Sequence, residues 1–189
     1  MLKGKTIVLG VTGGIAAYKS CDLVRRLRDA DADVFVMMTR AAQEFVTPLT
    51  FQTLSGHPVQ TNLFNLTEEY GINHISLADK ADLIVIAPAT ADILAKIACG
   101  LCDDMVTTVV CATKAPVLLS PSMNLHMWEN SVTRENIKKL KRLAYLIMEP
   151  EEGSLACGYE GKGRLPEPEA ILQEVIKILK ASKKVSFSE

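Results

Sequence analysis

The sequence predicts an α/β protein in which helices cover both faces of a central parallel sheet. Apolar runs of strand length recur along its 189 residues, and segments with the apolar spacing of helices separate most of them. The expected strands are 6–11, 34–38, 83–87, 117–119 and 143–148. This alternation is typical of parallel sheets, so we expect one domain over 1–189, a Rossmann-like (flavodoxin-like) three-layer sandwich.

Two helices are expected to pack on the sheet through apolar stripes. After the first strand, Ile15, Leu23 and Leu27 share one side of a helix, and charged residues occupy the other side. A last helix, from residue 167 to about 180, begins beside two prolines and turns aliphatic side chains inward. The polar tail 182–189 is expected to fray.

Composition favours a small-molecule partner over nucleic acid or a membrane. The 21 Lys and Arg residues against 22 Asp and Glu residues give a net charge of −1, without the basic excess that binds a phosphate backbone. No apolar run reaches the length of a membrane span, and the start lacks signal-peptide features. The five cysteines show no disulfide spacing, which favours a cytoplasmic compartment. Cys99 and Cys102 lack further metal ligands at suitable spacing, so no metal site is expected.

A glycine-rich turn, Gly10-Val11-Thr12-Gly13-Gly14, follows the first expected strand. Ligands of open α/β sheets bind beyond the carboxyl ends of the strands, and glycine lets backbone N–H groups approach a phosphate. The spacing differs from the dinucleotide fingerprint, and Thr39-Arg40 stands where an acidic residue would bind a ribose. A mononucleotide such as FMN fits better, with Thr12 and Thr39 as candidate hydroxyl donors. The alternative is that the glycines only form a tight strand-to-helix turn.

Four further segments carry a family resemblance. The first three are Asn73-His74-Ile75-Ser76-Leu77, Ala87-Pro88-Ala89-Thr90-Ala91-Asp92 and Pro121-Ser122-Met123-Asn124-Leu125-His126-Met127-Trp128. The third fills every fixed position of the P-x-M-N-x-x-M-W signature, so the chain resembles the homo-oligomeric flavin-containing cysteine decarboxylases. The fourth, Leu155-Ala156-Cys157-Gly158 with Gly161-Lys162-Gly163-Arg164, resembles the substrate loop of phosphopantothenoylcysteine decarboxylases. We therefore expect 153–168 to be a mobile substrate-binding loop.

The resemblance implies a carboxy-lyase of coenzyme A biosynthesis. Its reaction would be the FMN-dependent decarboxylation of 4'-phosphopantothenoylcysteine to 4'-phosphopantetheine, through a thioaldehyde and an enethiol. The implied catalytic residues are His74 as a base, Asn124 as the group that holds the substrate carboxylate, and Cys157 as the proton donor that completes the reaction. Without the resemblance, His74 would be interpreted as a packing residue and Asn124 as a helix cap.

The resemblance also implies the remaining site residues and the assembly. The cofactor-binding residues would be Gly13, Gly14, Thr39, Thr90, Ala91, Asp92 and Ile93, and the substrate-binding residues Met123, Asn124, Ala156, Cys157, Lys162 and Arg164. Lys162 and Arg164 could equally be solvated loop charges. The family forms trimers, and in some members dodecamers built from trimers, so we expect a homotrimer or a homododecamer.

Other functions stay open at this point. A peptidyl-cysteine decarboxylase of the lantibiotic type would stop at the enethiol, and the loop around Cys157 weighs against it. A non-catalytic regulatory flavoprotein often carries acidic extensions or has lost active-site residues. A flavin prenyltransferase of similar fold should lack the 121–128 signature. Many bacterial members are fused to a synthetase, so the chain is either monofunctional or one part of such a fusion.

Overall fold

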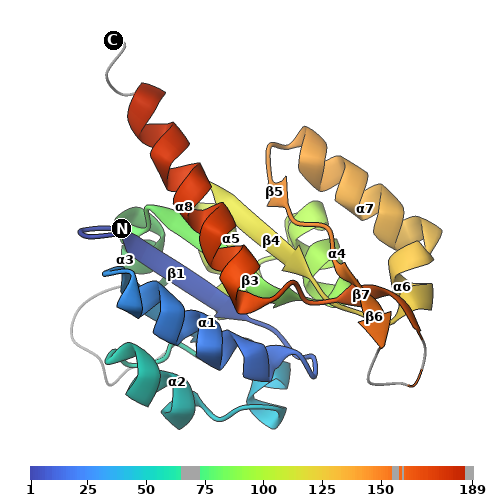
Figure 1. Ribbon diagram of the computed structural model, residues 1–189, viewed down its shortest axis with the longest axis horizontal. Coiled ribbons are helices and arrows are strands. Elements are labelled where there is room, and N and C mark those ends of the chain that lie inside the picture. Colours follow the sequence, from blue (N-terminus) through green and yellow to red (C-terminus); the bar gives the residue numbers. More distant parts are fainter. Residues whose placement is uncertain (65–72, 155–157, 159, 186–189) are drawn as a thin grey trace.

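The computed structural model describes residues 1–64, 73–154, 158 and 160–185 (Figure 1). A five-stranded sheet with the order β2-β1-β3-β4-β5 lies at its centre, and each neighbouring pair of these strands is parallel. The strands are β1 (Thr6–Val11), β2 (Asp33–Met38), β3 (Leu83–Ala89), β4 (Val117–Pro121) and β5 (Leu146–Ile147). The expected parallel sheet is therefore confirmed.

The fifth strand is much shorter than the expected 143–148. The preceding helix continues to Arg142, where Leu143 caps it, and Ala144 then adopts a left-handed backbone with φ of 65°. A residue in that conformation cannot belong to a strand. Pairing with β4 therefore begins only at Leu146.

Helices cover both faces of the sheet, as Figure 1 shows. On one face lie α1 (Ala17–Asp29), α2 (Pro48–Ser55) and α8 (Pro168–Val185). The other face is covered by α3 (Asn73–Lys80), α4 (Ala91–Cys99), α5 (Met105–Ala112) and α7 (Ser131–Arg142). Two short elements, η1 (Arg40–Glu44) and α6 (Leu125–Glu129), follow β2 and β4. No helix in the described part of the chain is long and apolar enough to span a membrane.

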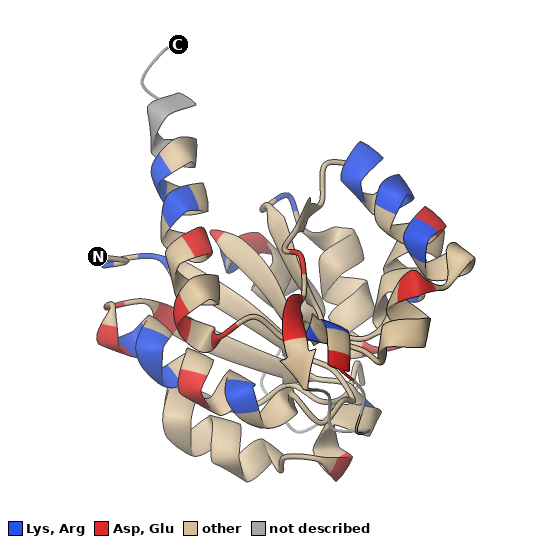
Figure 2. Ribbon diagram, turned by 45° about the vertical axis from the view of Figure 1, so that its right-hand side comes forward, with Lys and Arg blue, Asp and Glu red and all other residues tan. Residues whose placement is uncertain are grey.

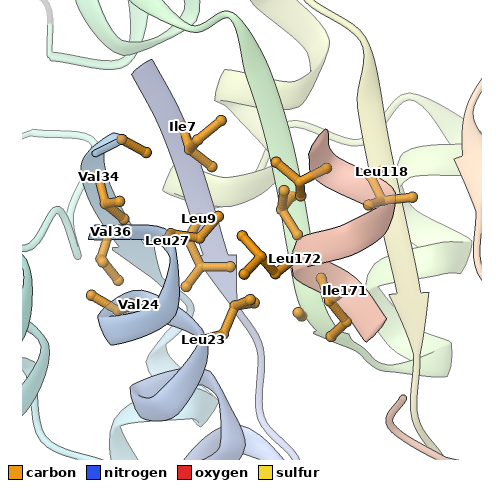
Figure 3. Close-up of a cluster of buried hydrophobic side chains, with 14 of the residues drawn as sticks. Ile7, Leu9, Leu23, Val24, Leu27, Val34, Val36, Leu118, Ile171 and Leu172 are labelled. Carbon is orange, nitrogen blue, oxygen red and sulfur yellow. The ribbon is translucent and has the colours of Figure 1, made fainter. Parts of the chain in front are cut away.

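Each face of the sheet has its own core, because successive strand side chains point to opposite faces. Ile7 and Leu9 of β1 pack in one cluster with Leu23 of α1 and Ile171 of α8 (Figure 3). Full burial of an aliphatic side chain of this size contributes about 1.5–3 kcal/mol. Ile15, which we expected on the buried side, precedes α1 and is 59% exposed.

The segment expected to be a loop, 153–168, contains regular structure. Strands β6 (Glu151–Ser154) and β7 (Glu160–Arg164) pair in an antiparallel hairpin. The Met123 N–H donates to the Gly163 carbonyl at 3.0 Å, which fastens β7 beside the segment that follows β4. After the hairpin, α8 continues to Val185, into the tail 182–189 that we expected to fray.

The direction of strand order reverses between β1 and β3. The chain passes from β1 to β2 on one side of this point, and from β3 to β4 on the other. In open parallel sheets, the loops at such a point diverge and leave a crevice at the carboxyl edge. The glycine turn after β1 and the segment 90–92 after β3 face each other there.

Candidate cofactor and substrate site

A cavity of about 1320 Å³ lies at the carboxyl edge of the sheet. Its walls come from the loops after β1, β2, β3 and β4 and from the β6–β7 hairpin. Nine of the predicted site residues line it: Gly13, Gly14, Thr39, Thr90, Ala91, Asp92, Met123, Asn124 and Arg164. The cavity is larger than the ~300–1,000 Å³ typical of small-ligand sites, so it has room for a mononucleotide and a second ligand.

The start of α1 offers an anion site at one end of the cavity. A Cβ atom at Gly13 would lie 2.4 Å from the Ala41 Cβ and 2.9 Å from its carbonyl carbon, so only glycine fits. The N-cap, Ala16, makes no side-chain cap, and the first turn contains no acidic residue. Because a helix start carries unpaired N–H groups and a partial positive charge, it attracts an anion such as phosphate. Arg40 lines the same cavity and adds positive charge, and so does Lys19, whose ammonium is paired with Glu167.

Thr39 joins the end of β2 to this region. Its backbone N–H donates to the Val11 carbonyl at 3.1 Å, and its hydroxyl oxygen accepts from the Ala42 N–H at 3.2 Å. The hydroxyl thereby caps η1, and its side chain is 9% exposed. A threonine that accepts through its oxygen can still donate its proton to a ligand.

The starts of α4 and α5 form the opposite, acidic end. The Thr90 hydroxyl caps α4 by accepting from the Ile93 N–H at 3.3 Å, and an Asp104 carboxylate oxygen caps α5 by accepting from the Thr107 N–H at 2.8 Å. Lys96 lies 3.0 Å from Asp103, and the hydrogen bond between them raises the pKa of Lys96. Asp92 and Asp104 are each 3.7 Å from the same ammonium group.

Signature residues of the segment after β4 form another wall of the cavity. The Asn124 side-chain oxygen accepts from the His126 N–H at 2.8 Å and caps α6, so the expected capping role is present. Because the oxygen is the acceptor in this cap, the amide nitrogen is the part of Asn124 that can donate to an anionic ligand. Met123 and Met127 line the cavity beside it, whereas Trp128 is buried in the core.

Arg164 brings the hairpin to the cavity. Its guanidinium pairs with Glu167 at 3.3 Å, and Lys19 donates to the same carboxylate at 2.7 Å. Lys19 also donates to the Leu165 carbonyl at 3.4 Å. These contacts fasten the end of the hairpin to α1. Elsewhere, basic and acidic residues are interspersed on α1, whereas α7 is mainly basic (Figure 2).

Two predicted residues lie away from the cavity lining. The Ile93 side chain is fully buried in the core beneath α4, and only its N–H takes part in the cap. Lys162 pairs with Glu149 at 2.9 Å and holds the pKa of that carboxyl below its usual range. Its ammonium lies 5.9 Å from the centre of the Trp128 ring.

His74, the expected base, is also not among the described residues that line the cavity. It is the second residue of α3 and is half-buried. Its Nδ1 atom is buried and has no hydrogen-bond partner among the described residues. An unpaired buried polar atom costs about 1–3 kcal/mol, so such atoms often acquire a partner in a complex. Ala156 and Cys157 lie outside the described residues.

Sequence reasoning missed several residues of the lining, among them Tyr18, Lys96, Asp103 and Asp104. The pattern Asp104-x-x-Thr107 before an apolar run was a readable helix-start signal, because it forms a capping box. Helical spacing also places Lys96 on the same side as Asp92, four residues earlier. Tyr18, 59% exposed, gave no comparable signal.

The strand order and the uncapped glycine turn at its reversal define a mononucleotide-binding class of α/β protein. The Flavoprotein family model matches residues 1–180, and the chain belongs to this family. It is 50% identical over 173 residues to the coenzyme A biosynthesis bifunctional protein CoaBC of Bacillus subtilis (strain 168). That match covers 92% of this chain and 43% of the relative, so the chain spans less than half of the relative's length.

Two solved structures share the fold over nearly their whole length. A cysteine-to-serine mutant of PPC decarboxylase, complexed with pantothenoylaminoethenethiol, matches with a TM-score of 0.82 and 29% identity, over 93% of this chain and 98% of that chain. The FMN-dependent cysteine decarboxylase SpaF matches with a TM-score of 0.80 and 28% identity, over 94% of this chain and 98% of that chain. These similarities confirm the predicted fold.

Proposed function

We propose that this chain is an FMN-dependent decarboxylase of 4'-phosphopantothenoylcysteine that forms 4'-phosphopantetheine in coenzyme A biosynthesis. One observation carries the proposal: the signature residues Met123 and Asn124 line the same cavity as the anion-binding turn Gly13-Gly14. The relatives support it, since one is a coenzyme A biosynthesis protein and another is a PPC decarboxylase.

The residues of the cavity fit FMN. The phosphate would lie at the start of α1, where Gly13 leaves no room for a Cβ atom and basic side chains are near. Thr39, Thr90, Ala91 and Asp92 would hold the rest of the cofactor. When bound, FMN would accept a hydride from the carbon that bears sulfur and later return it, which leaves the overall reaction redox-neutral.

Asn124 would orient the substrate carboxylate through its amide nitrogen. The cap on the His126 N–H fixes the amide, so the donor is directed before the substrate arrives. An amide donor does not neutralise a carboxylate as a guanidinium would, which leaves the carboxylate able to depart as CO2. Arg164, anchored by Glu167, would meet the anionic end of the substrate, with Lys162 beside it on the hairpin. Met123 and Ala156 would shape the pocket.

His74 would act from a neighbouring subunit. It is not among the described residues that line the cavity of its own chain, and its buried Nδ1 lacks a partner in the same part of the chain. A second copy that places α3 against the cavity would bring the imidazole to the substrate, where it would move the proton of the thiol. We therefore propose a homotrimer, or a homododecamer built from trimers. Cys157, between β6 and β7 in the sequence, would protonate the enethiol. A cytoplasmic location is part of the same proposal.

A mass-spectrometric assay with 4'-phosphopantothenoylcysteine under nitrogen tests this function. We expect a product that has lost only CO2. A product that has lost CO2 and two hydrogens would instead support the peptidyl-cysteine decarboxylase, and flavin binding without turnover would support a regulatory flavoprotein. The matched variants are His74→Asn, which should retain FMN and release no CO2, and Cys157→Ser, which should stop at the enethiol after one round. Full activity of either variant would contradict its assigned role.

A further inference from the structure

The end of β3 leaves the hydrogen-bond ladder of the sheet before the strand ends. Its pairing with β1 stops at Ile86, and its register with β4 shifts between Ile86 and Ala89. The carbonyl groups of Ala87 and Pro88 therefore need other donors, because a buried carbonyl without a hydrogen bond is costly. Two hydroxyl groups supply them: Ser20 donates to Ala87 at 2.7 Å and Thr12 donates to Pro88 at 2.6 Å.

Thr12 makes a second contact that Ser20 does not make. Its hydroxyl oxygen accepts from the Thr90 backbone N–H at 3.2 Å, and the two threonine hydroxyl oxygens lie 3.4 Å apart. Thr12 is only 1% exposed. Because its one hydroxyl proton is directed at Pro88, Thr12 does not fit the role of phosphate donor that the sequence left open.

These contacts join the two turns that face each other at the reversal of strand order. On one side, Thr12 directly precedes Gly13 in the turn that begins α1. On the other side, it holds the backbone of Thr90, which caps α4 and is followed by Ala91 and Asp92 in the cavity wall. A single buried hydroxyl thus links the turn before α1 to the backbone at the start of α4.

We propose that Thr12 is a positioning residue for the cofactor: its hydroxyl sets the spacing of the α1 and α4 starts and thereby the affinity for FMN. The inference rests on the proposed function, since it concerns the same cavity. It goes further by assigning a role to the hydroxyl of Thr12, a residue that lines the cavity but whose hydroxyl bonds to Pro88 and Thr90 within the protein. A shift of well under about 1 Å at two walls of a preorganised site weakens binding, because both walls must be in register with one rigid ligand.

Ser20 provides a matched control. Its hydroxyl is fully buried and donates to the Ala87 carbonyl, next to the Pro88 carbonyl that Thr12 binds. Ser20 is not among the described residues that line the cavity, and this bond does not reach Thr90. Ser20→Ala therefore removes the same kind of hydrogen bond from the same strand end without releasing α4. If burial alone mattered, the Thr12 and Ser20 variants would behave alike.

The experiment compares the wild type with Thr12→Val, Thr12→Ser and Ser20→Ala. Each apoprotein is titrated with FMN by flavin fluorescence, and the visible circular dichroism of bound FMN and the thermal midpoint are recorded. We expect Thr12→Val to lose at least about tenfold in FMN affinity and to change the dichroism, Thr12→Ser to stay within about twofold, and Ser20→Ala to lower only the thermal midpoint.

If Thr12→Val does not fold, Thr12→Ala, which removes the hydroxyl without adding a methyl group in its place, is used instead with the same expectation. Wild-type affinity in the hydroxyl-free variant would overturn the inference, and so would an equal loss in Ser20→Ala. Failure of the wild-type apoprotein to bind FMN would overturn the proposed function itself, which separates the two claims.

Discussion

The starts of α1, α4 and α5 face the same cavity, but α1 differs from α4 and α5 in how its first turn is capped and charged. The start of α1 has a glycine turn, no side-chain cap and no acidic residue in its first turn. The starts of α4 and α5 are capped by Thr90 and Asp104, and Asp92 lies in the first turn of α4. The same kind of backbone element thus gives one helix end that is available to an anion and two that are satisfied by their own side chains.

The difference gives the cavity an electrostatic direction. Near α1 the cavity is lined by Arg40, by Glu44 and by Lys19, which is paired with Glu167, whereas three carboxylates surround the single ammonium group of Lys96 near α4 and α5. An anionic ligand group is therefore attracted to the first end and repelled from the second. The charge difference between the two ends therefore orients the ligand before its uncharged part makes any specific contact.

The largest effect is expected from Gly13→Ala. A Cβ atom there would overlap Ala41, including its backbone, so the turn must move and the anion site is lost. We expect FMN affinity to fall at least about 100-fold in an apoprotein titration. Gly14→Ala is the control, because its Cβ would meet only the Thr90 methyl at an ordinary 3.6 Å. Similar losses of FMN affinity in both variants would show that the close approach of Gly13 to Ala41 is not what shapes the anion site.

A smaller effect is expected at the acidic end from Lys96→Met. Loss of the ammonium leaves the carboxylates of Asp92, Asp103 and Asp104 unbalanced, and we expect a loss of about 1–2 kcal/mol in urea unfolding at neutral pH. The folded-state pKa of Lys96 is raised above its ordinary value of 10.5, so from neutral pH up to about that value its contribution is unchanged, and it disappears as the pH rises through the folded value. Measured upward from neutral pH, the stability difference between wild type and variant should therefore narrow only in alkaline solution. A difference that narrows between about pH 7 and pH 9 would contradict this assignment.

The smallest effect is expected from the cap of α5. Asp104→Ala removes the acceptor for the Thr107 N–H, which should cost about 1 kcal/mol, or a thermal midpoint lower by roughly 2–4 °C. Asp104→Asn retains a cap and should recover most of this stability. FMN affinity should change little in either variant, in contrast to Gly13→Ala. A large change in FMN affinity in Asp104→Ala would show that this end of the cavity also takes part in binding the anion.

Much of the sheet could be predicted because its strands are short apolar runs, and such runs between helical segments are typical of strands buried on both faces of a sheet. The hairpin β6–β7 could not, since residues such as Gly153, Gly161 and Lys162 have no strand preference. Their pairing depends on contacts with remote segments, such as the bond from the Met123 N–H to the Gly163 carbonyl. Tertiary contacts outweigh local preference there.

The site shows the same division. Motif residues on turns, such as Gly13, Thr90 and Asn124, line one cavity at the sheet edge, because strand ends meet there. Ile93 was assigned to the cofactor by its place in a motif, although helical spacing puts it with the buried stripe of α4. His74 was assigned as the base by its place in a motif, and it is not among the described residues that line the cavity.

The most direct test of the account compares the affinities of the apoprotein for FMN and for riboflavin, which lacks only the phosphate. If the start of α1 binds the phosphate, FMN should bind at least about 100-fold more tightly, and Gly13→Ala should remove most of that difference. Equal affinities of the wild type for the two flavins would contradict the assignment of this helix start as the anion site.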